Sequence, residues 1–160
     1  MSLILGKDGF KKLMAGYPTV SDKYDVAPAT LESGTAYNGS VMKHGSAHSL
    51  YVVASSVAAA SDIAGVLLAT NIKVPSVWPA GSGSVATNAG EQFNLIVRGF
   101  VAVELDADAV LADAVEGAPV YITSAGKLTP DSSGNIALSW KFTGVTELDG
   151  TAKLAEIVIE

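Results

Sequence analysis

The chain has 160 residues, of which 49% are hydrophobic and only 16% are charged, and it contains no cysteine. This length fits one domain with one hydrophobic core, and the lack of cysteine excludes disulfide bonds and thiolate metal sites. The net charge of −6, without a basic stripe, argues against a nucleic-acid partner because such a field repels phosphate.

The N-terminal residues predict one short helix and an arm. Asp8 is placed to cap a helix over residues 8–15, and Pro18 prevents its continuation. The apolar stripe of this helix consists of Phe10, Leu13 and Met14. Two helical turns are unstable alone, so the stripe must dock on the domain's own core or on a neighbour. We interpret residues 18–33 as extended or loose, which divides the chain into an arm (1–33) and a β domain (34–160).

The β domain begins with a turn and three short strands. Asn38-Gly39 predicts a type I′ hairpin turn, since both residues tolerate positive φ. Strands are then expected at residues 41–42, 50–54 and 66–74. The stretch of residues 50–69 is the longest apolar one, but serines and Asp62 interrupt it, so we expect no membrane helix and no membrane partner. The first six residues also lack the features of a signal peptide.

The strongest strand is expected at residues 93–105. Its odd positions are apolar or Gly, whereas its even positions mix polar residues with Ile96 and Phe100. One face therefore belongs to the core, and a second layer or a subunit is expected to cover the other. Gly99 marks a bulge or a bend, as glycine inside a strand pattern often does.

The C-terminal part repeats short alternating runs that are separated by turns. Residues 106–114 are acidic and predict a short helix or coil. Strands follow at residues 118–123, 136–142 and 154–159, with period-two alternation cut by Gly, Asn and Asp. About eight short strands predict an all-β fold, an antiparallel sandwich or barrel with the jelly roll among the options, preceded by the N-terminal helix.

Candidate chemistry is sparse along the chain. His44 and His48 are the imidazoles available to a hydrolase, and a nucleophile elbow is missing. Their spacing suits two metal ligands on a helix, but Gly45 argues against a helix there, so a polar loop is the preferred interpretation. Asp106 and Asp108 are better explained as a solvated acidic face than as a cation site. We therefore expect no catalytic residue, no cofactor and no metal.

Trp78 lies in a long loop between two prolines, before a Gly-Ser-Gly-Ser run. The run lacks the Lys-Thr/Ser ending of a phosphate loop, so a flexible loop is expected. An exposed Trp78 would anchor a protein contact or a sugar, whereas a buried one would fill an end of the barrel.

Several segments of residues 90–160 together resemble a known family. They are Ile96-Val97-Arg98-Gly99-Phe100-Val101-Ala102-Val103, Gly117-x-Pro119-Val120-Tyr121-Ile122, Gly126-Lys127-Leu128-Thr129, a Ser-Gly-Asn turn, Phe142-Thr143-Gly144 and Leu154-Ala155-Glu156-Ile157-Val158-Ile159. This pattern resembles the tailed-phage capsid cement or decoration proteins, which include head fibre and structural cement proteins.

The resemblance implies a non-enzymatic all-β protein that oligomerises and binds the outside of the phage head. It would bridge copies of the major capsid protein, reside in the virion and be made in the bacterial cytoplasm. A homotrimer is slightly favoured over a dimer.

The expected capsid contacts come from the arm and from the long loop. The candidate residues are Phe10, Leu13, Met14, Tyr17, Tyr24 and Trp78. We expect the arm to add a strand to a sheet edge of the capsid protein, so that deletion of residues 1–25 abolishes binding and leaves the β domain folded. The alternative is a β-sandwich that binds glycan or a host surface through Trp78, and a hydrolase using His44 or His48 ranks last.

Overall fold

The chain is built almost wholly of strands in its computed structural model, which describes residues 13–19, 24–68 and 86–160. The strands are β1 (Tyr24–Leu31), β2 (Thr35–Tyr37), β3 (Val41–His44), β4 (Leu50–Val53), β5 (Ile63–Leu67), β6 (Ala86–Asn88), β7 (Gln92–Glu104), β8 (Pro119–Ile122), β9 (Leu128–Thr129), β10 (Ile136–Asp149) and β11 (Ala152–Ile159). Two single 3-10 turns accompany them, η1 (Ala60–Asp62) and η2 (Leu111–Asp113). The predicted all-β class is confirmed.

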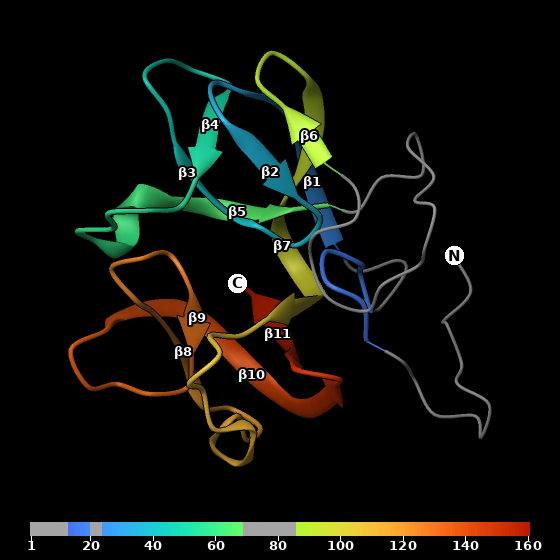
Figure 1. The fold of residues 1–160 in the computed structure, drawn as a ribbon, viewed down its shortest axis with the longest axis vertical. Coiled ribbons are helices and arrows are strands. Elements are labelled where there is room, and N and C mark those ends of the chain that lie inside the picture. Colours follow the sequence, from blue (N-terminus) through green and yellow to red (C-terminus); the bar gives the residue numbers. More distant parts are fainter. Residues whose placement is uncertain (1–12, 20–23, 69–85) are drawn as a thin grey trace.

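Five strands close into a barrel in the upper half of Figure 1. Their order is β1-β4-β3-β5-β7, and β1 also pairs with β7, so the ring has no free edge. The residues buried inside are Ala29, Leu31, Ala36, Met42, Leu67, Phe93 and Leu95. Closure is the means by which an all-β protein removes strand edges that would otherwise pair with other chains.

Strand β7 is long enough to serve two lobes. Its second half pairs with β11, and the sheet continues through β10 and β8 to β9, in the lower half of Figure 1. A parallel bridge between Leu105 and Leu128 brings β9 back to the end of β7. The C-terminal sheet therefore curls back toward β7, where one isolated bridge joins its ends.

The largest apolar cluster lies between the two lobes. The outer face of the barrel contributes Val41, Val66 and Ile96, while the C-terminal sheet contributes Trp140 and Phe142, among others. The alternating face predicted for residues 136–142 is thus confirmed, and so is a second layer over β7. That layer comes from the chain itself.

Gly99 lies where β7 passes from one lobe to the other. It pairs with Tyr24 of β1 on one side and with Ile159 of β11 on the other. Its φ of 115° is a conformation that favours glycine. The register between β1 and β7 also shifts between Asp25 and Val26. The irregularity predicted near Gly99 is therefore present.

The expected hairpin at Asn38-Gly39 is wrong in its pairing. The turn exists, because the Ser40 N–H donates to the Tyr37 carbonyl at 2.9 Å. Gly39 has positive φ but Asn38 does not, so the turn is not type I′. Strand β2 pairs with β6, and β3 pairs with β4 and β5. The turn routes the chain from a small two-stranded sheet into the barrel.

The predicted helix over residues 8–15 lies mostly outside the described residues. Its last three residues are described, and they are not helical; a turn at Ala15-Gly16 follows Leu13 and Met14. Residues 69–74 of the strand predicted at 66–74 also lie outside. In the part of the chain that the structure covers, no helix has the length and apolar character needed to span a membrane.

Candidate interaction surfaces

The N-terminal segment 13–19 lies along the second edge of β7. The Gly16 N–H donates to the Ala102 carbonyl at 2.8 Å, and the Ala102 N–H donates to the Tyr17 carbonyl at 3.1 Å. The Leu13 N–H donates to the Glu147 carboxylate of β10 at 2.7 Å. The segment thus adds a strand-like stretch to its own sheet. The segment would need these same backbone N–H and carbonyl groups to add a strand to a partner's sheet, and here they are already paired within the chain.

Two of the expected capsid anchors are buried in this chain. Leu13 is 1% exposed and Met14 is 7% exposed. Leu13 packs with Ala15, Ala102 and Leu154 in a cluster of its own. Of the two docking sites expected for this apolar stripe, the structure shows the domain itself, because small Ala102 leaves room on the outer face of β7 for Leu13.

The remaining expected anchors are only partly accessible or lie outside the description. Tyr17 and Tyr24 are half-buried, and burial raises the pKa of the Tyr17 phenol. Tyr24 packs against the main core cluster. Phe10 and Trp78 lie outside the described residues.

The second half of the expected arm is barrel wall. Strand β1 pairs with β7 from Tyr24 to Thr30, and with β4 at Thr30 and Leu31. Deletion of residues 1–25 would therefore remove the buried Leu13 and the half-buried Tyr24. We no longer expect that deletion to leave the β domain intact.

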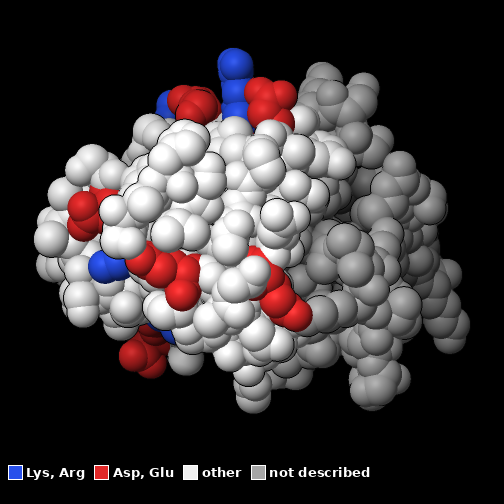
Figure 2. Space-filling view, turned by 90° about the horizontal axis from the view of Figure 1, so that it is seen from above, with Lys and Arg blue, Asp and Glu red and all other residues white. Residues whose placement is uncertain are grey.

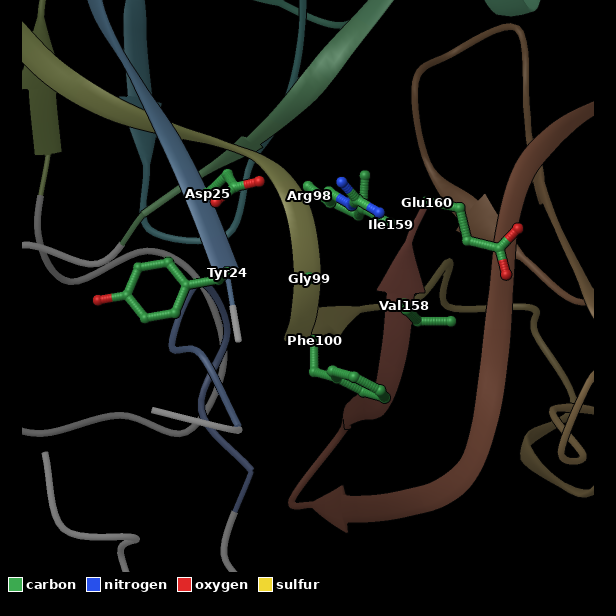
Figure 3. A pocket seen from close by; sticks show the side chains of 8 residues that line it. All are labelled: Tyr24, Asp25, Arg98, Gly99, Phe100, Val158, Ile159 and Glu160. Carbon is green, nitrogen blue, oxygen red and sulfur yellow. The ribbon is translucent and has the colours of Figure 1, made fainter. Parts of the chain in front are cut away.

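A hollow of about 620 Å³ opens beside Gly99, where the two lobes meet (Figure 3). It is lined by Tyr24, Asp25, Arg98, Gly99, Phe100, Val158, Ile159 and Glu160. Asp25 and Arg98 are directly opposite residues of β1 and β7. Charged side chains of both signs and apolar side chains line this hollow together, which suits a contact surface.

His44 is the last residue of β3, and His48 lies in the loop between β3 and β4. The His44 ring packs against the Tyr51 ring at a centroid distance of 5.7 Å. Among the described residues, no hydrogen bond to either imidazole is recorded. The loop is instead held by Glu32, whose carboxylate accepts the N–H of Ser46 at 3.0 Å and also its hydroxyl. This geometry fits the polar-loop interpretation.

The Glu32 contact predicts a pH-dependent loop. Hydrogen bonds from the Ser46 side chain and backbone lower the pKa of the Glu32 carboxyl. A depressed folded-state pKa means that the contact stabilises the loop above the ordinary Glu pKa, and that this contribution is lost as the pH falls through the folded pKa. We expect the Ser46 amide to lose hydrogen-exchange protection on acidification, and Glu32→Ala to lack protection at neutral pH. Equal protection of the Ser46 amide in wild type and Glu32→Ala at neutral pH would contradict this prediction.

The acidic residues 106–116 form a loop around η2 at the lower end of Figure 1. The Asp106 carboxylate accepts the Asp108 N–H at 2.9 Å, which is a local turn. In the ranges that the structure describes, no group of three or more His, Asp or Glu side chains is arranged to hold a metal ion.

Most of the exposed large apolar side chains belong to the acidic loop and to the β10–β11 hairpin. Among the described residues, six large apolar side chains are exposed: Val26, Tyr37, Val110, Val115, Val145 and Leu148. Four of them belong either to the acidic loop or to the β10–β11 hairpin. We call Val110, Val115, Val145 and Leu148 the valine–leucine patch. Our sequence reasoning missed it; the available signal was valines inside an acidic stretch.

Figure 2 looks onto the barrel end from above, opposite the acidic loop. Uncharged atoms cover much of this face, and acidic groups occur both at its border and across its lower middle part. The loops here consist largely of Ser, Gly, Ala, Thr and His, including residues 44–49 and 86–90.

Comparison with known proteins decides the family. The model of the family described as "Structural cement protein (E217 gp24/Pam3 gp6)" matches residues 7–160. The chain belongs to the phage structural cement protein family. Its match covers both lobes and most of the N-terminal segment, well beyond the 70 residues on which the sequence resemblance was based.

A solved structure shares the fold of this cement protein. A chain of "The capsid of Myoviridae Phage XM1" superposes with a TM-score of 0.65 at 19% identity, and the alignment covers 93% of this chain and 91% of that one. No curated protein sequence matches. The predicted family is confirmed, and the chain is a structural protein of the phage capsid.

Proposed function

We propose that this cement protein binds the outside of the major capsid protein lattice and stabilises the assembled head. The observation that carries the proposal is the family match over residues 7–160. The protein would act without catalysing a reaction. Its synthesis would take place in the cytoplasm of the infected bacterium.

The physical basis is differential binding. A protein that binds only the assembled lattice stabilises it by mass action, since detachment must precede dissociation of the capsid subunits. A typical specific interface buries about 1,600 Å² in total, and an oligomer that engages several subunits gains further through avidity. The barrel has no free strand edge, so its described surface offers a partner mainly side chains and loops.

Binding to purified heads tests the proposal. Expanded capsids assembled without this protein are mixed with it, sedimented and heated. We expect the protein to co-sediment at saturable stoichiometry and to raise the melting temperature of the capsid. A protein that stays in the supernatant at micromolar concentration would contradict the proposal. A parallel glycan-binding assay with wild type and Trp78→Ala tests the alternative host-surface role.

The oligomeric state is part of the proposal, with a homotrimer slightly preferred over a dimer. One chain has a mass of 16.3 kDa. Light scattering on the purified protein is therefore expected to give about three times this mass. A mass of twice that of the chain would favour a two-fold arrangement instead.

A further inference from the structure

We infer that the valine–leucine patch is the surface that docks on the capsid, and that its partner is a capsid-protein surface with an apolar centre and lysine or arginine around it. This inference rests on the proposed function. It assigns the contact to Val110, Val115, Val145 and Leu148, and it gives the chemistry of the surface that they meet.

The four patch residues come from two segments that lie against each other. Leu148 and Lys153 are directly opposite residues of the β10–β11 pair, so their side chains project from the same face. The Lys153 ammonium donates to the Ala109 carbonyl at 2.7 Å and also to the Ala107 carbonyl. Leu148 therefore projects on the side of the hairpin that carries the acidic loop, where Val110 lies.

A second contact shows that the backbones carrying the other two residues run side by side. A Cβ atom added to Gly144 would lie 3.1 Å from the Glu116 nitrogen, so β10 and the acidic loop touch at this point. Val145 and Val115 are the sequence neighbours of these two residues. Both are exposed, Val115 at 56% and Val145 at 39%.

The exposure of this patch is costly in water. Val110 is 56% exposed and Leu148 is 61% exposed. Burial of each such side chain on a partner contributes favourable free energy in proportion to the apolar area removed from water. Exposed apolar groups that gather at one place and have a polar rim mark interaction sites, whereas single exposed ones need no explanation.

The charge around the patch indicates the partner's chemistry. The loop contributes the carboxylates of Asp106, Asp108, Asp113 and Glu116, and no Lys or Arg occurs anywhere in residues 99–126. The cation that reaches the loop, Lys153, is hydrogen-bonded to backbone carbonyls. A surface of this sign disfavours acidic or phosphate-rich partners and attracts a basic one, which fixes register and accelerates encounter.

The test compares serine substitutions at matched exposed valines. Val110→Ser with Val115→Ser removes half of the patch, and Val26→Ser in β1, where Val26 is 43% exposed, is the control at the other lobe. We expect the double variant to bind expanded capsids at least tenfold more weakly, as loss of central apolar contacts commonly does, and the control to bind like wild type. Thermal unfolding of each free variant checks that the fold is retained.

Charge is tested separately, with salt as a second readout. Asp108→Asn with Asp113→Asn is expected to weaken capsid binding and to reduce its dependence on ionic strength. Asp131→Asn, at an exposed carboxylate in the turn before β10, is the control and is expected to change neither.

The outcomes separate this inference from the proposed function. If wild type fails to bind capsids, the proposed function falls. If wild type binds, and the valine and aspartate variants bind as tightly as it does, the assignment of the patch is overturned. An equal loss of capsid binding in Val26→Ser would also overturn the assignment, because the effect would then not be specific to the valine–leucine patch.

Discussion

Gly126→Ala is expected to destabilise this protein by roughly 2–6 kcal/mol, because the added methyl group has no space and the backbone there has positive φ. Gly126 has φ of 85°, which costs a non-glycine residue about 1–3 kcal/mol. The new Cβ would also overlap the Ala54 carbonyl, and overpacking costs a further 1–3 kcal/mol or so.

The position matters because the β8–β9 turn joins the two lobes. The Val57 N–H, in the segment after β4, donates to the Ser124 carbonyl at 3.0 Å, within the same turn as Gly126. An altered turn would therefore loosen the barrel from the C-terminal sheet. Urea unfolding measures the change.

A matched glycine provides the control for this substitution. Gly134, in the turn before β10, has φ of 72° but no heavy atom within 4 Å of an added Cβ. Gly134→Ala is expected to cost only the backbone strain of about 1–2 kcal/mol. Equal losses at the two positions would show that the close approach to Ala54 contributes nothing to stability.

Leu13→Ala is the second substitution with a large expected effect, a loss of about 2–5 kcal/mol in the free energy of unfolding. Leu13 is 1% exposed and packs with Ala102 and Leu154 on the outer side of the C-terminal sheet. Its truncation leaves a cavity and removes the main apolar attachment of segment 13–19. Denaturant unfolding measures the loss.

Leu148→Ala is the control for Leu13→Ala, since the same truncation at a side chain that is 61% exposed is expected to change stability by at most about 0.5 kcal/mol. Hydrogen exchange adds a local readout. The Gly16 and Thr19 amides donate to β7 carbonyls and are expected to be protected in wild type and to lose protection in Leu13→Ala. Wild-type stability in Leu13→Ala would restore the interpretation of this segment as a loose arm.

Leu13→Ala is also a sharper experiment than the deletion of residues 1–25. Removing residues 1–25 would damage the core and also remove the expected arm anchors Phe10 and Tyr17, so a loss of capsid binding would have two explanations. The patch variants change only exposed side chains, and Leu13→Ala changes a buried one. The two sets of variants therefore separate folding from attachment.

Sequence reasoning succeeded where local pattern and tertiary role agree. Ile136, Leu138, Trp140 and Phe142 alternate with polar residues, and the structure turns this face toward the core. The strands at residues 93–105 and 154–159 were predicted for the same reason. It failed for β2, β6 and β9, whose two or three residues are too few to establish a period.

Strand β1 shows a different limit. Its sequence has Pro28 and little alternation, so it suggested an arm. Pairing with β7 and β4 makes it part of the barrel wall, and only the closure of the ring requires a strand there. Likewise, the sequence showed that Leu13 and Met14 are apolar neighbours, but it did not show which part of the fold they pack against.

The sequence by itself determined the all-β class, the acidic charge, the main strand faces and the resemblance to cement proteins, because composition and period-two alternation are local properties. Only the tertiary structure decided how β7 is shared by the barrel and the C-terminal sheet, that segment 13–19 covers its outer edge, and which valines remain exposed. Those features depend on contacts between residues far apart in the chain. Val110 and buried Val120 are the same amino acid, and it is the packing around each that leaves one for a partner and places the other in the core.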